Sequence, residues 1–335
     1  MALKIAINGF GRIGRLVYRA ILENDDKDIN VVCINDLGPP NSNAHLLKFD
    51  TIHGILPHNV EVEGDYILVD HRPVKVTAEK DPLKLPWEEL GVDIALECTG
   101  LFTSKIAASA HLNAGAKKVL ISAPASEADI TVVYGVNSDK LTPDHRIVSN
   151  ASCTTNCLAP VAHVLHEALG IERGFMTTIH SFTGDQRTVD TLHGDLHRAR
   201  TASVSMIPTS TGAARAVGLV LPELEGKLDG TSIRVPTPNV SVIDFKFVPT
   251  KATDIDSVND AIKDASEGKL KGILSTNEMP LVSVDFNHNP HSSIFDLAET
   301  QVIESQFVRV MSWYDNEWGF SNRMIDTAKA MGNLL

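Results

Sequence analysis

The first 36 residues hold the feature that most restricts the fold: two apolar strands joined by a glycine-rich turn and a helix. Residues 3–8 (LKIAIN) form one apolar run, and residues 29–36 (INVVCIND) form another. Between them, apolar side chains recur at the spacing of one helix face. A helical connection of this kind joins strands that lie parallel. The segment therefore predicts an α/β fold built on a parallel sheet.

The turn between the first strand and the helix, GFGRIG, matches G-x-G-x-x-G from Gly9 to Gly14. Such glycines let the backbone approach a pyrophosphate, and the helix start offers it N–H groups. Asp36 ends the next strand, where a carboxylate accepts hydrogen bonds from a ribose diol and repels a 2′-phosphate. We therefore predict a Rossmann-type NAD site that includes Gly9, Gly11, Gly14 and Asp36. The alternative is a tight turn with no ligand.

Polar residues follow two further predicted strands of the same sheet. Thr99 comes directly after ALEC (residues 95–98), and Ser122 follows KVLI (residues 118–121). Ligands bind outside the carboxyl ends of parallel strands, so both side chains are candidates for the same crevice. Taken alone, each also fits an ordinary polar strand end.

The chain changes character after residue 152. We predict a helix over residues 153–169, a strand in GFMTTIHSF, and an irregular segment over 181–206. The runs SIRVPTPNVSVIDFKFVP, LVSVDFNHN and QFVRVMSWYD are predicted as long antiparallel strands. A final amphipathic helix lies in NEWGFSNRMIDTAKAMGNLL. The second half is therefore expected to be an α+β domain.

Composition narrows the class of function. The 335 residues include 42 acidic and 30 basic side chains, which gives a net charge of −12 and disfavours nucleic-acid binding. Only four cysteines occur, which suits a reducing cytoplasm. No apolar stretch is long enough to span a membrane, and no signal peptide is evident. We therefore expect a cytoplasmic protein without a membrane partner.

Cys153 is the candidate nucleophile, because it lies where a strand ends and a helix begins. A helix start lowers a thiol's pKa and favours thiolate. His180 ends the strand FMTTIH and is the candidate base. Each residue also fits a plainer role, the cysteine as a small buried side chain and the histidine on the surface.

Two other interpretations of this cysteine are weaker. A Cys153–Cys157 disulfide is disfavoured within a regular helix in a reducing compartment. A zinc site that recruits His163 and His166 is disfavoured because both point well around the helix from Cys157. No metal is therefore expected, and Cys157 is assigned no chemistry.

The second half also holds candidate anion sites. Thr211 and Gly212 lie at a predicted helix start, where N–H groups can hold a phosphate or where the threonine is simply an N-cap. Arg234 lies in an otherwise apolar strand and needs a partner, either a phosphate or a carboxylate. Arg198 lies in the irregular segment, where it is a further anion candidate or a solvated charge.

Over essentially its whole length the chain resembles the phosphorylating, NAD-dependent (type I) glyceraldehyde-3-phosphate dehydrogenases. The resemblance is carried in order by INGFGRIGR, SNASCTTNCLAP, TTIHS, PTSTGAA, RVPTPNVSV and WYDNEWGFSNRM. It implies an NAD-binding domain over residues 1–152, completed by a C-terminal helix over 317–335. It implies a catalytic domain with a mostly antiparallel sheet over 153–316. Family members are usually homotetramers, with the segment matching 181–206 at a subunit contact.

The resemblance also implies residue roles. Cys153 would be the nucleophile and His180 its base. Cofactor contacts would come from the backbone of Arg12 and Ile13 and from Asp36, Lys80, Ser122 and Asn316. The substrate C3 phosphate would meet Thr183 and Arg234. Inorganic phosphate would meet Ser152, Thr154, Thr211 and Gly212, with Arg198 near both.

The implied reaction is the oxidation of D-glyceraldehyde 3-phosphate to 1,3-bisphosphoglycerate with NAD and inorganic phosphate. The nearest alternative is erythrose-4-phosphate dehydrogenase, in which water releases the acyl group. The intact STGAA stretch around Thr211 and Gly212 favours phosphate as the attacking group. A non-catalytic binding protein on the same scaffold is a third hypothesis.

Overall fold

The computed structural model describes residues 2–335, and the chain divides into two compact units. The first unit holds the residues up to 134, residues 138–151 and residues 321–335. The second unit holds residues 135–137 and 152–320. No helix among the described residues is long and apolar enough to cross a membrane.

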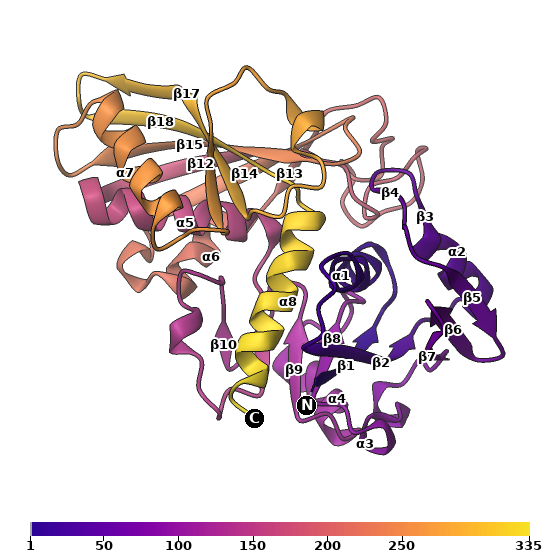
Figure 1. Cartoon of the computed structure of the whole chain (residues 1–335). Helices are drawn as coiled ribbons and strands as arrows, with labels where there is room; N and C mark the ends of the chain where they lie inside the picture. The colour runs from indigo at the N-terminus through magenta and orange to yellow at the C-terminus, as the bar shows by residue number, and fades with distance from the viewer. Residues whose placement is uncertain (1) are drawn as a thin grey trace. The chain divides into compact units, whose positions relative to one another are not determined.

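The first unit is built on a nine-stranded sheet in the order β10-β11-β9-β8-β1-β2-β7-β6-β5 (Figure 1). Its strands are β1 (Leu3–Asn8), β2 (Ile29–Asn35), β5 (Val60–Glu63), β6 (Tyr66–Val69), β7 (Arg72–Thr77), β8 (Ile94–Glu97), β9 (Lys118–Ile121), β10 (Ile130–Thr131) and β11 (Ile147–Ser149). Its helices are α1 (Arg12–Glu23), α2 (Pro40–Lys48), α3 (Trp87–Leu90) and α4 (Lys105–Asn113), and β3 (Phe49–Asp50) pairs with β4 (Gly54–Ile55).

The predicted parallel sheet is confirmed. Strands β1, β2, β7, β8, β9, β10 and β11 pair in parallel, and only β5, β6 and β7 form an antiparallel excursion. Every residue of β8 and β9 is buried, as expected for strands covered on both faces. The strand order reverses at β1, which lies between β8 and β2. Such a reversal marks the place where ligands bind in sheets of this kind.

Glycine is required where β1 passes into α1. Gly9 has a φ of +92°, a conformation that side chains with a Cβ disfavour. A Cβ on Gly14 would lie 2.1 Å from the Gly9 carbonyl oxygen. The helix therefore packs against the turn at a distance that leaves no room for a methyl group.

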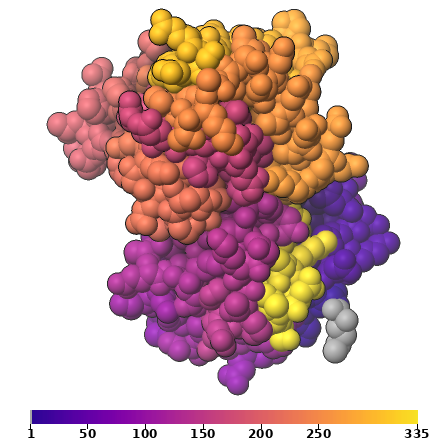
Figure 2. All heavy atoms as spheres, turned by 90° about the vertical axis from the view of Figure 1, so that its left-hand side faces the viewer, coloured from indigo at the N-terminus to yellow at the C-terminus, as the bar shows by residue number. Residues whose placement is uncertain are grey.

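The last helix, α8 (Trp318–Gly332), contributes its residues from Ser321 onward to the first unit. The Thr327 hydroxyl donates to Asn150 Oδ1 at 2.7 Å, and Lys329 forms an ion pair with Asp26 at 2.5 Å. Figure 2 shows the end of the chain, in yellow, between purple and indigo surfaces of this unit. Residues near both ends of the sequence thus complete one unit.

The second unit contains a seven-stranded sheet in the order β13-β14-β12-β15-β18-β17-β16. Its strands are β12 (Ile171–Ser181), β13 (Ile207–Ser210), β14 (Leu228–Val235), β15 (Ser241–Pro249), β16 (Leu274–Asn277), β17 (Ser293–Ile303) and β18 (Phe307–Tyr314). Its helices are α5 (Cys153–Leu169), α6 (Ala213–Val220) and α7 (Ile255–Glu267). The mostly antiparallel sheet is confirmed, and so is the helix over residues 153–169.

Three details of the predicted second half are wrong. Strand β14 runs parallel to β12, not antiparallel. The run SIRVPTPNVSVIDFKFVP is two strands, because Pro236 and Pro238 lie in a break where they need not donate to a ladder. The run LVSVDFNHN is not a strand. Its residues Ser283–Phe286 form a short 3₁₀ helix, which Asp285 caps by accepting the Val282 N–H at 2.8 Å.

The glycine turn generates a prediction about stability. Gly14→Ala should lower the free energy of unfolding by about 1–3 kcal/mol, because its methyl group overlaps the Gly9 carbonyl. The matched control is Gly11→Ala, since a Cβ there meets nothing within 4 Å. Denaturant unfolding without cofactor compares the two, and equal losses in both variants would contradict this account.

Candidate active site

A cavity of about 510 Å³ opens where the strand order of the first unit reverses. It lies at the carboxyl ends of β1, β2 and β8 and is lined by five of the predicted cofactor residues: Gly9, Gly11, Asp36, Lys80 and Thr99. Arg12, Ile13 and Gly14 form the first turn of α1 behind it. Ser122 lies just beyond β9, next to the end of β8, where its N–H donates to the Glu97 carbonyl at 3.0 Å.

The start of α1 is arranged to receive an anion. Gly11 is the N-cap residue and supplies no side chain to the first N–H groups of the helix. The Asp36 carboxylate accepts the N–H of Phe10 at 2.8 Å and of Gly38 at 3.0 Å, which ties the turn to the end of β2. Arg12 is engaged in an ion pair with Asp50. These residues fit a dinucleotide, because the uncapped helix start, the glycine backbone and the Asp36 carboxylate line one cavity.

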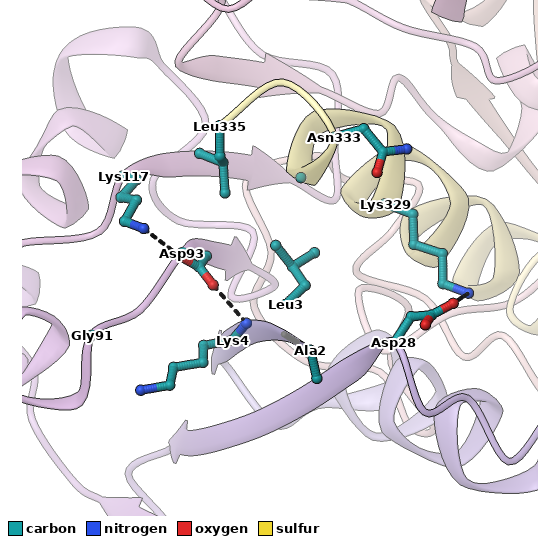
Figure 3. A pocket seen from close by; sticks show the side chains of 11 residues that line it. Ala2, Leu3, Lys4, Asp28, Gly91, Asp93, Lys117, Lys329, Asn333 and Leu335 are labelled. Carbon is teal, nitrogen blue, oxygen red and sulfur yellow. Dashed lines mark hydrogen bonds and ion pairs between the residues drawn. The ribbon is translucent and has the colours of Figure 1, made fainter.

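A larger cavity, of about 680 Å³, lies at the other end of the strands, where β1 and β8 begin (Figure 3). Its Asp93 carboxylate is already engaged, since it accepts from the backbone N–H of Lys4 at 2.8 Å and from Lys117 Nζ at 2.7 Å. Ligands of parallel sheets bind at the carboxyl edge, so the smaller cavity is the candidate cofactor site.

The second unit brings the predicted nucleophile and base together. Cys153 is the first residue of α5, and Ser152 is the N-cap, whose hydroxyl accepts the Thr155 N–H at 3.0 Å. His180 lies near the end of β12. The distance between Cys153 Sγ and His180 Nε2 is 3.5 Å.

The other nitrogen of His180 faces two groups that compete for it. Nδ1 lies 2.7 Å from the Ser181 carbonyl oxygen and 2.7 Å from an Arg234 Nη atom. A hydrogen on Nδ1 can be donated to the carbonyl, which leaves the Nε2 lone pair facing the thiol. When Arg234 donates to Nδ1 instead, the hydrogen lies on Nε2. The position of Arg234 therefore decides whether His180 can accept the Cys153 proton.

Burial controls the charge of this pair. Burial and the nearby Arg234 guanidinium lower the pKa of His180 to about 3. Burial also raises the pKa of the Cys153 thiol, although the Arg234 charge and hydrogen bonds with Thr154 act to lower it. The net lowering predicted from the helix start is therefore wrong, because burial outweighs it. Proton transfer between the two side chains avoids an isolated buried charge, since each product charge compensates the other.

Tyr314, which was not predicted from the sequence, packs beside Cys153 and His180. Its hydroxyl lies 2.8 Å from the Thr154 hydroxyl and 2.9 Å from the Thr178 hydroxyl. Its ring meets the His180 ring edge-on, with centroids 5.9 Å apart. The only sequence signal for it is a tyrosine at the end of an apolar strand, just before Asp315 and Asn316.

The anion candidates gather near two helix starts. Thr211 and Gly212 precede α6, and the Thr211 hydroxyl accepts the Ala213 N–H at 3.1 Å. The Thr155 hydroxyl of α5 donates to the Ala213 carbonyl at 3.3 Å, which joins the two helix starts. Ser152 and Thr154 therefore lie in the neighbourhood of Thr211 and Gly212.

The remaining site candidates differ in their surroundings. Arg234 pairs in register with His180 across β12 and β14, and its buried Nε has no hydrogen-bond partner among the described residues. Arg198 is paired with Asp185, and the Thr183 N–H donates to Gln186 Oε1 at 2.8 Å. Asn316 accepts from the hydroxyls of Ser181 at 2.9 Å and Ser241 at 2.8 Å, which fixes the orientation of its amide.

Cys157 has a separate environment. It is fully buried in α5, with Sγ 3.3 Å from the Ser293 hydroxyl, and burial raises the pKa of its thiol to about 12. All four cysteines are free thiols, so the disulfide alternative is absent from the described residues.

Comparisons with known proteins find relatives of a single family that align with the full chain. Residues 3–105 match the family model described as glyceraldehyde 3-phosphate dehydrogenase, NAD binding domain, and residues 152–316 match the corresponding C-terminal domain. Glyceraldehyde-3-phosphate dehydrogenase of Xanthobacter flavus is 67% identical over 334 residues, and that of Cereibacter sphaeroides is 62% identical over 335; both alignments cover 100% of each chain. The enzyme of Geobacillus stearothermophilus is 57% identical and covers 98% of each chain. The chain belongs to the glyceraldehyde 3-phosphate dehydrogenase family.

Proposed function

We propose that this chain oxidises D-glyceraldehyde 3-phosphate to 1,3-bisphosphoglycerate, with NAD and inorganic phosphate as co-substrates. The observation that carries the proposal is the 3.5 Å approach of Cys153 Sγ to His180 Nε2, with Arg234 on the far side of the imidazole. The relatives' names favour this reaction over the hydrolytic oxidation of erythrose 4-phosphate.

Cys153 and His180 begin the chemistry by moving one proton. With its hydrogen on Nδ1, His180 accepts the thiol proton at Nε2, and the Cys153 thiolate attacks the aldehyde carbon. A C–S bond forms as the C=O π bond opens, and the former carbonyl oxygen takes the proton back from His180 Nε2 to become the hydroxyl of a hemithioacetal. Covalent attachment divides one difficult oxidation into two easier steps.

NAD, when bound, supplies the acceptor for the hydride that leaves the hemithioacetal carbon. Its binding is assigned to Gly9, Gly11, Arg12, Ile13, Gly14, Asp36, Lys80, Thr99 and Ser122 in the first unit, and to Asn316 in the second. His180 takes the hydroxyl proton as the carbonyl forms again, and Cys153 is left carrying the acyl group as a thioester.

Phosphate binding completes the proposal. Arg234 and Thr183 would hold the substrate phosphate, and Ser152, Thr154, Thr211 and Gly212 would hold inorganic phosphate, with Arg198 near both. The adjoining starts of α5 and α6 support the second assignment, because helix starts favour anions. A phosphate oxygen attacks the thioester carbon, the C–S bond breaks, and the acyl phosphate leaves Cys153 as thiolate.

A homotetramer in the cytoplasm is the proposed working state. Residues 182–206 hold no helix or strand, and five of their apolar side chains are 70–93% exposed: Val189, Leu192, Leu196, Val204 and Met206. Monomeric proteins rarely leave apolar side chains of this size so exposed together, which supports a subunit contact over this segment.

Removing the nucleophile tests the assignment. Cys153→Ser should reduce turnover by at least about a thousandfold while NAD affinity stays unchanged, because the cofactor residues are intact. Cys157→Ser is the matched control and should keep turnover within a few-fold. Steady-state kinetics and calorimetric NAD titration measure both, and full turnover by Cys153→Ser would reject the nucleophile.

Phosphate dependence distinguishes the two acyl-transfer reactions. Without phosphate, glyceraldehyde 3-phosphate should yield one burst of NADH per active site and then stall, because the thioester persists on Cys153. Added phosphate should restore continuous turnover. Sustained NADH production from erythrose 4-phosphate without phosphate would instead support hydrolytic release.

The buried imidazole makes stability depend on pH. His180 has a folded pKa near 3 and an ordinary unfolded value of 6.5, so between these values the unfolded chain binds the extra proton. Stability should therefore fall as the pH drops through this window. Between pH 7 and pH 5 the unmodified protein should lose about 2 kcal/mol more than His180→Asn. Denaturant unfolding at both pH values measures this difference, and parallel losses would contradict it.

A further inference from the structure

A network of buried polar side chains lies beneath the glycine turn of the first unit. Asn8 ends β1 and Glu97 ends β8, and the two residues are paired in register across the point where the strand order reverses. Asn8 Nδ2 donates to Glu97 Oε2 at 2.6 Å. The Glu97 side chain is fully buried, so its charge state matters for everything bound above it.

Glu97 receives three further hydrogen bonds. His111 Nε2 lies 2.9 Å from Oε2, while the N–H of Thr99, at 2.8 Å, and the Thr99 hydroxyl both reach Oε1. The Thr99 hydroxyl already accepts the Leu101 N–H at 3.0 Å, so its own hydrogen points to the carboxylate.

The hydrogens in this network are fixed from both ends. At one end the Trp87 indole, which can only donate, gives its N–H to His111 Nδ1 at 3.1 Å, so the His111 hydrogen is on Nε2. At the other end the backbone N–H of Glu79 donates to Asn35 Oδ1 at 2.9 Å. Asn35 Nδ2 therefore donates to Asn8 Oδ1 at 2.7 Å, and Asn8 Nδ2 is left to donate to Glu97.

Glu97 is therefore a carboxylate. Four neighbouring groups present hydrogens to its two oxygens, and none is an acceptor for a carboxyl hydrogen. His111 is neutral, because its Nδ1 accepts a hydrogen bond. No lysine or arginine is among the groups that contact Glu97 in the described network. One negative charge is thus hydrogen-bonded to Asn8 and Thr99, which line the crevice, and has no cationic partner in the described network.

The direction in which a dinucleotide would lie follows from the same strand order. Asp36 ends β2, on one side of β1, and is suited to the adenosine ribose. The pyrophosphate belongs at the start of α1, so the nicotinamide half extends to the other side, over the end of β8. The cavity spans both sides, with Lys80 and Asp36 at one end and Thr99 and Phe102 at the other.

We propose that the Glu97 carboxylate favours the oxidised form of the bound cofactor. The oxidised nicotinamide ring carries a positive charge that the reduced ring lacks. A buried negative charge beneath that half of the crevice attracts NAD⁺ more than NADH, because the interior screens it weakly. The inference rests on the proposed NAD site. Glu97 then influences whether NAD⁺ or NADH binds more tightly, although it does not contact the reacting atoms.

Thr99 links this charge to the shape of the site. A Cβ on Gly9 would lie 2.7 Å from the Thr99 backbone nitrogen, so the two backbones touch. Loss of any hydrogen bond to Glu97 should disturb this contact and weaken the binding of NAD⁺ and of NADH by the same factor. Loss of the charge should weaken the binding of NAD⁺ alone. The ratio of the two dissociation constants therefore separates these effects.

The test measures dissociation constants of NAD⁺ and NADH by calorimetry on the full-length protein. Glu97→Gln keeps the side-chain length and removes the charge, and it should raise the ratio of the NAD⁺ constant to the NADH constant by about 3- to 30-fold. Thr99→Val is the matched control. It removes both hydrogen bonds of the Thr99 hydroxyl, to Glu97 and from Leu101, and keeps the charge, so both constants should rise by the same factor. An unchanged ratio in Glu97→Gln overturns the proposal.

The unmodified protein supplies a second test if Glu97→Gln does not fold. It should bind NAD⁺ at least as tightly as NADH, and clearly tighter binding of NADH overturns the proposal. A protein that binds neither form would instead overturn the proposed function, and this inference with it.

Discussion

The close approach of backbones at the glycine turn is the constraint on which the first unit depends. Gly14 lies against the Gly9 carbonyl, and Gly9 lies against the Thr99 backbone. These contacts bring the ends of β1 and β8 together and start α1 above them, without a side chain over its first N–H groups. The same geometry thus closes the core and leaves an anion site open, because Gly9, Gly11 and Gly14 carry no Cβ.

Burial has opposite consequences for the charge of an ionisable side chain in the two units. In the first unit, Glu97 keeps its charge because four hydrogens surround it. In the second unit, His180 loses its charge because burial and Arg234 both oppose protonation. Each outcome follows from which atoms face the buried group, since an interior penalises any charge that is not compensated.

The sequence predicted well those features that depend on neighbouring residues. The bounds of β1 and α5 follow from apolar runs and from the residues that cap them. Cys153 begins a predicted helix and His180 ends a predicted strand, and the structure brings the two residues together. Tyr314 could not be predicted, because its partners Thr154 and Thr178 are more than 130 residues away. The Glu97 network could not be predicted either, because it joins residues of separate strands and helices. The parallel pairing of β14 with β12 was missed for the same reason, since strand direction depends on how the long connection between them returns.

The position of α8 has a consequence for synthesis on the ribosome. Residues 321–335 belong to the same unit as residues 2–134, although 169 residues of the second unit, 152–320, are translated between them. The second unit can therefore acquire its own core while the cofactor-binding unit still lacks its last helix. Until Thr327 and Lys329 emerge, Asn150 and Asp26 remain without these contacts, so the unit that begins the chain is completed last.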